Sequence, residues 1–263
     1  MAKDKLKRKL TTIFSSENKT PTMRSSALRR FLVSCADTGL ILFIGLGICQ
    51  CSFLEKPSTT ELFVHEIRCS VLNVVVRSPY QADALIACEG ARDAMGFLAS
   101  QGLELPHNIA IELLARLPAG VSESAAGCCV ESERRALILV YSGFKKFNTW
   151  FGVPIDRPLY RSLVSHEVAH LVAAHNFRIP KPSLPAKEYV AYITQFETME
   201  PGLRDSVLSH FPCEAFEGES QMKTIIYMFD CMRFGVRAYR HYLKLANRRD
   251  FLHAILNGKA LIE

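Results

Sequence analysis

Residues 166–170 read His-Glu-Val-Ala-His, within a segment whose apolar residues recur at helical spacing. On a helix, side chains at positions i and i+4 lie one above the other. His166 and His170 therefore present two imidazoles toward one point, which suits a metal ion. Glu167 lies about 100° around the helix axis, where it can reach a water on that metal without replacing it. The motif thus requires a helix and nominates Glu167 as a general base.

The flanking sequence favours such a helix. Asp156 is a suitable N-cap, Pro158 fits the first turn, and no proline or glycine occurs between Arg161 and Asn176. A broad apolar face would be formed by Leu159, Leu163, Val164, Val168, Leu171 and Val172. The alternative is a metal-free domain in which this is a buried helix and the two histidines only pack or form hydrogen bonds.

A catalytic zinc site needs three protein ligands and an open position for water. One known pattern places a third histidine six residues after the second, but Asn176 occupies that position here. His175 would face about 180° away from His166 if the helix continues, so we interpret it as a helix-end residue. The third ligand must come from another element.

A glutamate from the following helix is the better candidate. The segment from Ser183 to Ile193 begins with a possible serine cap and an early proline, which is typical of a helix start. Glu188 lies in the first turns of that helix, so a short loop can fold it back over the histidines. Glu197 and Glu200 are fallback candidates, although charges at a helix end more often face solvent.

His166, Glu167, His170 and Glu188 together resemble the metal site of the gluzincin zinc metallopeptidases, over roughly residues 137–198. The arrangement is also similar to that of a group of exported bacterial proteins of unknown function. The resemblance implies zinc (Zn²⁺) bound by the two histidines and Glu188, with Glu167 as general base in the hydrolysis of a peptide or protein substrate. The alternative is a non-enzymatic module, stabilised by zinc or binding peptide, on the same scaffold.

Two further features follow from this resemblance. The apolar run from Ala136 to Tyr141 would be the strand along the cleft that pairs with extended substrate, or else an ordinary core strand. A histidine or tyrosine downstream of the glutamate helix would stabilise the oxyanion. His241 and Tyr239 are the candidates for that role, and the alternative is a polar helix face that only holds neighbouring segments together.

The sequence predicts an α+β fold, namely a compact zincin-like domain with a small mixed sheet, an active-site helix, a glutamate helix and a helical C-terminal part. Strands are expected at Val71–Val76, Ile109–Leu114 and Ala136–Tyr141, and helices at Gln81–Gln101 and Glu219–Ala246. A last short helix should end at Asn257–Gly258, and Glu200–Gly218 is expected to be irregular.

Nine cysteines occur, and none of them forms a C-x-x-C pair, so a cysteine zinc site is not expected. Six of the nine lie beyond residue 55 and could form up to three disulfides in an exported domain. The adjacent Cys128 and Cys129 are expected to bond to other partners rather than to each other.

The chain is divided by charge into a basic leader, residues 1–54, and a metallopeptidase-like domain, residues 55–263. The leader holds nine Lys and Arg against three Asp and Glu, whereas the rest of the chain holds 23 of each. We therefore expect no nucleic-acid binding. The basic segment followed by the apolar run Thr38–Leu54 predicts a signal peptide or membrane anchor, with Met23 as the native start. The domain would then be exported, either periplasmic or extracellular, and would contact the membrane only through an uncleaved leader.

Overall fold

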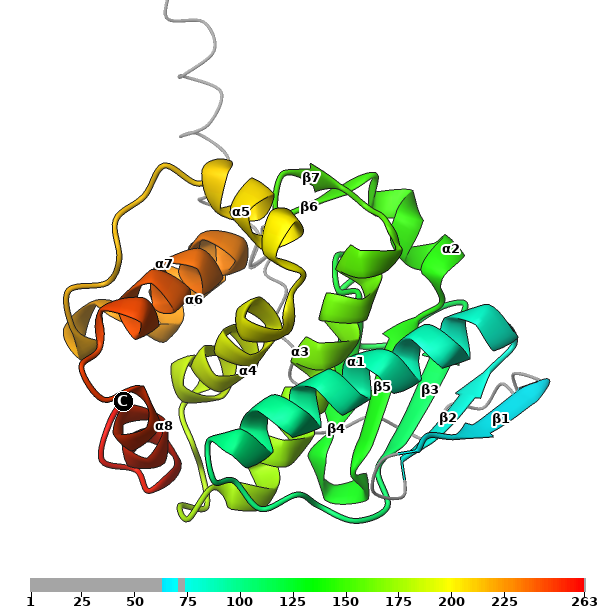
Figure 1. The fold of residues 1–263 in the computed structure, drawn as a ribbon, viewed down its shortest axis with the longest axis horizontal. Helices are drawn as coiled ribbons and strands as arrows, with labels where there is room; N and C mark the ends of the chain where they lie inside the picture. Colours follow the sequence, from blue (N-terminus) through cyan, green and yellow to red (C-terminus); the bar gives the residue numbers. More distant parts are fainter. Residues whose placement is uncertain (1–62, 71–73, 263) are drawn as a thin grey trace, which may run out of the picture. The chain divides into compact units, whose positions relative to one another are not determined.

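A mixed sheet of five strands, with helices packed on one of its faces, forms the frame of the protein (Figure 1). The computed structural model describes residues 63–70 and 74–262. The expected leader lies outside these residues. The prediction of an α+β fold with a small mixed sheet is confirmed.

The strand order in the sheet is β1-β2-β3-β5-β4. The three central strands run parallel, and the two outer strands run antiparallel to their neighbours. The strands are β1 (His65–Arg68), β2 (Val75–Ser78), β3 (Ala110–Leu114), β4 (Gly127–Val130) and β5 (Arg135–Leu139). A second, two-stranded sheet consists of β6 (Thr149–Trp150) and β7 (Val153–Pro154).

Alternation along the strands gives the large sheet two different faces. Val76 and Ile111, which are paired in register, belong to the main core on the inner face. On the outer face, the Glu112 carboxylate forms ion pairs with the guanidinium groups of Arg77 and Arg135, with N–O distances of 3.5 and 3.2 Å. The helices consequently pack on the inner face.

Two long helices, α1 (Gln81–Ser100) and α3 (Arg157–Asn176), cover the inner face of the sheet. They approach closely at Gly90, where an added Cβ would lie 2.6 Å from the carbonyl oxygen of Arg161. The Ser165 hydroxyl also donates to the Gly90 carbonyl at 3.0 Å. The absence of a side chain at Gly90 thus lets the motif helix lie against both α1 and the sheet.

Most of the remaining helices lie away from the sheet (Figure 1). Helix α4 (Leu184–Thr198) packs on α3, and α7 (Cys231–Lys244) packs on α4. The shorter helices are α2 (Tyr141–Phe144), α5 (Pro201–Ser209), α6 (Thr224–Phe229) and α8 (Arg248–Leu256), and 3₁₀ turns occur at Glu131–Glu133, Lys145–Phe147 and Glu219–Gln221. No helix in residues 63–70 and 74–262 is long and apolar enough to cross a membrane.

The predicted helix starts are confirmed. The Asp156 carboxylate accepts from the Leu159 amide at 2.8 Å, and the Ser183 hydroxyl accepts from the Ala186 amide at 3.2 Å. Both caps satisfy amides that have no partner within the helix. The two caps fix the residues at which α3 and α4 begin. They therefore also set the positions of His166, His170 and Glu188 along the helix axes.

Two other predicted segments were wrong. The tail was expected to be one helix from Glu219 to Ala246, but Asp230 adopts an extended conformation, and its carboxylate caps α7 by accepting from the Arg233 amide. The stretch Glu200–Gly218, expected to be irregular, contains α5, which Glu200 caps through the amides of Gly202 and Leu203.

The cysteines form one disulfide in the described part of the chain. It joins Cys69, just after β1, to Cys88 in α1. Cys128 and Cys129 are not bonded to each other, as expected, but the expectation that they would form disulfides with other cysteines was wrong, since both retain their thiols. Three of the nine cysteines lie in the leader, outside the described residues.

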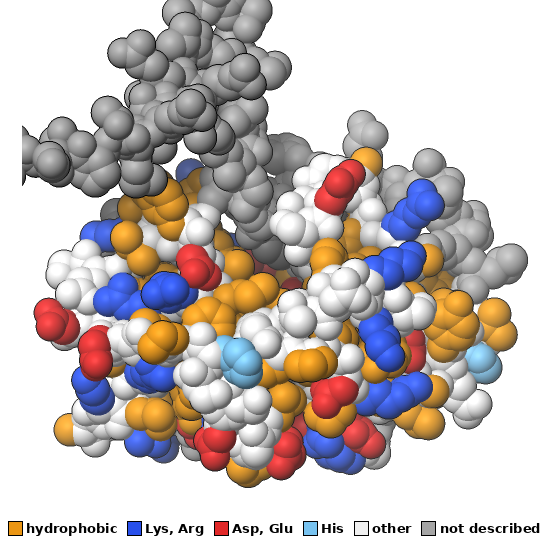
Figure 2. Space-filling model, turned by 90° about the horizontal axis from the view of Figure 1, so that it is seen from above, with side chains coloured by type: hydrophobic (Ala, Val, Ile, Leu, Met, Phe, Trp, Pro, Cys, Tyr) orange, Lys and Arg blue, Asp and Glu red, His pale blue; other side chains and the backbone are white. Residues whose placement is uncertain are grey.

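Acidic and basic side chains are interspersed with apolar ones over the face shown in Figure 2. No extended patch of a single sign dominates this face, which agrees with the equal numbers of basic and acidic residues after residue 54.

Candidate metal centre

Helix α3 brings His166 and His170 to one place, as their spacing predicts. Both imidazoles are buried, with 7 % of each residue exposed. Their rings meet edge to face with centroids 4.8 Å apart, and the two Nε2 atoms are separated by 3.2 Å. The two nitrogens therefore face a common point in the interior.

Helix α4 supplies the third group. Glu188, which is 2 % exposed, places one carboxylate oxygen 3.6 Å from His166 Nε2 and the other 3.6 Å from His170 Nε2. The predicted trio of His166, His170 and Glu188 is thus brought together in the structure as a buried group that could hold a metal ion.

The spacing of these atoms fits a metal ion. Ligand atoms at 2.0–2.2 Å from a tetrahedral centre lie about 3.3–3.6 Å from one another. The separations of 3.2 and 3.6 Å between atoms of His166, His170 and Glu188 are close to that range. No large rearrangement of α3 and α4 is required to bind the ion.

Burial also favours the neutral form of both histidines. It lowers the pKa of His166 to about 4, and the hydrogen bond to Gln195 works in the opposite direction. Burial likewise lowers the pKa of His170, helped by the nearby His166 and Lys187. Both imidazoles are therefore neutral near pH 7, the form in which histidine binds metal.

Gln195 orients the first imidazole. Its Oε1 lies 3.1 Å from Nδ1 of His166, and its own amide group donates to the Ser162 hydroxyl at 3.4 Å. An amide oxygen at Nδ1 places the ring proton there and leaves the lone pair of Nε2 directed at Glu188. Sequence reasoning missed Gln195, although it lies seven residues after Glu188 on the same helix face.

Tyr192, one turn after Glu188, borders the same cluster. Its ring lies edge-on to His166 with centroids 4.7 Å apart. Burial raises the pKa of the Tyr192 hydroxyl, with further contributions from Cys231, Tyr227 and Glu188. Tyr192 is therefore a protonated phenol beside the cluster, and it too was missed from sequence.

Glu167 points to a different neighbour, the outer strand β4. The Cys129 thiol lies 3.3 Å from Glu167 Oε2 and 3.1 Å from the backbone oxygen of Glu167. A Cβ added at Gly127 would lie 2.7 Å from Glu167 Oε1. The buried carboxylate of the motif is consequently in contact with the sheet.

For the predicted strand Ala136–Tyr141, the structure favours the alternative of a core strand over a strand along the cleft. Tyr141 begins α2, whereas residues 136–139 belong to β5, which lies between β3 and β4 and uses both of its edges in the sheet. It is a core strand, and it cannot add an extended substrate by strand pairing. The strand that contacts Glu167 is β4, whose four residues were not predicted as a strand.

The fallback ligands have other roles. Glu197 accepts a hydrogen bond from the Tyr239 hydroxyl at 3.0 Å, and Glu200 caps α5. His175 lies in the last turn of α3, 3.9 Å from Glu104, as a helix-end residue should. These contacts leave Glu188 as the third member of the cluster.

The two oxyanion candidates lie on α7, where both contact α4. Tyr239 donates to Glu197 and stacks on Phe196 with ring centroids 5.0 Å apart. His241 Nδ1 lies 2.8 Å from the Tyr189 hydroxyl. These contacts hold α7 against α4, which is the alternative role considered from the sequence. An oxyanion role for either residue stays a prediction.

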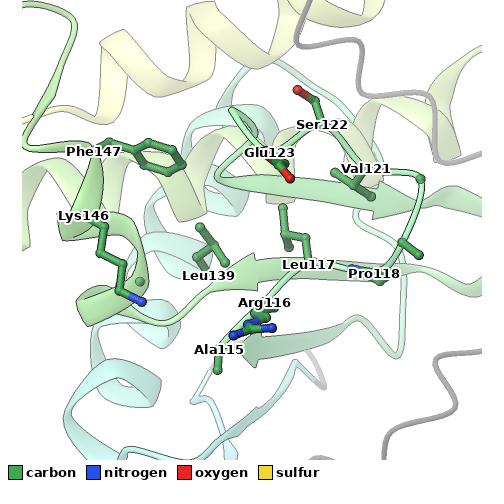
Figure 3. Close-up of a pocket in the computed structure, with 13 residues that line it drawn as sticks. Ala115, Arg116, Leu117, Pro118, Val121, Ser122, Glu123, Leu139, Lys146 and Phe147 are labelled. Atoms are coloured by element: carbon green, nitrogen blue, oxygen red, sulfur yellow. The ribbon is translucent and has the colours of Figure 1, made fainter. Parts of the chain in front are cut away.

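A separate pocket of about 490 Å³ lies where β3 and β5 end (Figure 3). The β3–β4 loop, residues 115–123, forms one wall, and Leu139, Lys146 and Phe147 contribute to the other. None of His166, His170 and Glu188 lines it. The pocket and the buried cluster are therefore distinct features.

Comparison with protein families gives one result. A model described as a family of unknown function (DUF6639) matches residues 74–263. The chain belongs to this family. The DUF6639 region contains the strand β4, the motif helix α3 and the glutamate helix α4, and hence the whole cluster. Comparison with curated proteins and with solved structures gave no match.

We predict that the purified chain binds about one divalent metal ion and that chelation lowers its melting temperature, because an ion bound only by the folded state adds to folding free energy. His166→Ala, His170→Ala and Glu188→Ala should each lose most of the metal in elemental analysis. Glu197→Ala and Glu200→Ala are matched controls and should retain it. If Glu188→Ala retained the metal and either control variant lost it, the third ligand would be misassigned.

Gln195→Ala should weaken metal binding by about 10- to 100-fold, because the ring of His166 loses the acceptor that fixes its tautomer. Gln195→Glu keeps an oxygen at that position and should bind more tightly than the alanine variant. Competition with a chelating dye measures both affinities. Equal affinities for Gln195→Ala and the unmodified chain would contradict the orienting role.

Proposed function

We propose that the DUF6639 region of this chain is a zinc-dependent peptidase. The observation that carries the proposal is the buried cluster of two neutral imidazoles and one carboxylate at the spacing of metal ligands. Two histidines and a glutamate are a known ligand set of catalytic zinc, and three protein ligands leave the fourth position open. The resemblance of the motif to gluzincins supports the same assignment.

Glu167 would act as the general base. When bound, zinc polarises the scissile carbonyl and lowers the pKa of a coordinated water toward about 7. The Glu167 carboxylate would accept a proton from the attacking water and pass it to the leaving amine. Its position next to His166 in the motif supports this role, because a rotation of about 100° around α3 separates it from the two histidines, so that it is not itself a ligand.

Glu167→Gln should abolish most cleavage while the zinc content stays near one per chain. Loss of a general base reduces the rate by about a hundredfold to ten-thousandfold. The measurement is cleavage of a diverse peptide library by the zinc-loaded chain, with Glu197→Gln as a matched carboxylate-to-amide control that should keep full activity.

The same assay separates an enzyme from a binding module. Undiminished cleavage by Glu167→Gln would point to a contaminating protease or another base. If both proteins bind zinc and retain peptide equally but cleave none of the library, the non-enzymatic module is the correct function.

We also propose that the domain is exported. The Cys69–Cys88 disulfide supports this, since disulfides persist in oxidising compartments. The basic leader followed by an apolar run supports it independently.

A reporter that fluoresces only in the cytoplasm, fused after Glu263, should be dark with the full chain. The same fusion lacking residues 1–54 is the control and should be bright, because the signal for export is removed. A bright full-length fusion would contradict export. Intact mass of the exported protein then distinguishes a cleaved leader from a retained anchor.

A further inference from the structure

Gly127 and Cys129 are alternate residues of β4 and so face the same side of the sheet. That side is the inner face, against α3, and Cys129 belongs to the main core there. The intervening Cys128 faces the opposite side, where it packs with Leu114 and Leu137. One strand thus directs two neighbouring cysteines to two different environments.

The pair formed by Gly127 and Cys129, here called the β4 cradle, contacts both carboxylate oxygens of Glu167. The Cys129 sulfur lies within hydrogen-bond distance of Oε2, at 3.3 Å. On the other side, the backbone of Gly127 comes so close that a Cβ would lie 2.7 Å from Oε1 and 2.8 Å from Cδ. Any side chain at position 127 would therefore displace the carboxylate.

The same thiol also ties the strand to the backbone of α3. Its sulfur lies 3.1 Å from the carbonyl oxygen of Glu167, so the single thiol hydrogen is shared between this oxygen and Oε2. Cys129 is 8 % exposed and Glu167 is 4 % exposed, so the contact is shielded from solvent. A hydrogen bond to a charged acceptor in such surroundings is stronger than one in water.

We propose that Cys129 is a positioning residue that holds the Glu167 carboxylate for proton transfer, with Gly127 providing the space. The inference rests on the proposed peptidase function, because it assigns the cradle to the base of that site. A glutamate side chain has several rotatable bonds, and a base must be held within a few tenths of an ångström of its working position. The cradle restricts those bonds without using a metal ligand.

The first test compares steady-state cleavage by zinc-loaded Cys129→Ala, Cys129→Ser and Cys128→Ala. Cys129→Ala should reduce kcat by about tenfold, the lower end of the range for a hydrogen bond to a charged group because a thiol is a weak donor, with KM and zinc content unchanged. Cys129→Ser keeps a donor and should recover most of that loss. Cys128→Ala removes another buried thiol, on the other face of the sheet, and should leave kcat unchanged.

Gly127→Ala should also reduce kcat with zinc retained, because the added Cβ moves the carboxylate. Melting temperatures identify any variant that is unfolded rather than misaligned. Wild-type kcat in Cys129→Ala, or an equal loss of kcat in Cys128→Ala, would overturn the positioning role.

A second measurement does not depend on turnover. The infrared S–H stretching band of Cys129 is isolated by subtracting the spectrum of Cys129→Ala from that of the unmodified chain. Donation to a carboxylate lowers and broadens this band, so it should shift in the Glu167→Gln background, whereas the Cys128 band should not. An identical Cys129 band in both backgrounds overturns the inference even if peptides are cleaved. A shifted band without cleavage of any peptide supports the contact and rejects the proposed function.

Discussion

The packing of α3 on α4 is the contact on which the rest of the site depends. It brings a carboxylate that is 2 % exposed against two buried imidazoles from another helix. Removing a carboxylate from water is costly, and a divalent cation held by Glu188 and the two histidines would provide opposite charge where solvent is excluded. Asp156 and Ser183 cap α3 and α4 and so set where each helix starts. These two capping residues therefore help to determine where His166, His170 and Glu188 lie along their helices.

Much of this arrangement follows from the sequence because it depends on local periodicity. The i, i+4 spacing of His166 and His170 requires only that α3 be helical. Glu188 could be identified since the loop between the helices is short and its helix start is marked by Ser183 and Pro185. Helix α1 was predicted almost to its ends for the same reason, namely a long apolar pattern without interruption.

The elements that were missed depend on tertiary contacts. Strand β4 has only four residues, Gly-Cys-Cys-Val, and its conformation comes from pairing with β5 rather than from strong local preference. The tail helix breaks at Asp230 because its carboxylate caps α7, a choice that the continuous apolar pattern concealed. Gln195 and Cys129 have ordinary sequence contexts, and only the fold shows that one faces His166 and the other Glu167.

Two consecutive residues of α3 therefore contact different elements of the fold. His166 turns toward α4, where Glu188 and Gln195 meet it, whereas Glu167 turns toward β4. The rotation of about 100° between neighbouring helix positions produces this division. The proposed metal binding would therefore depend on the α3–α4 interface, whereas the position of the proposed base, Glu167, would depend on the α3–β4 interface. A substitution in β4 can disturb the base while the ligand cluster stays intact, which is why the two interfaces can be examined separately.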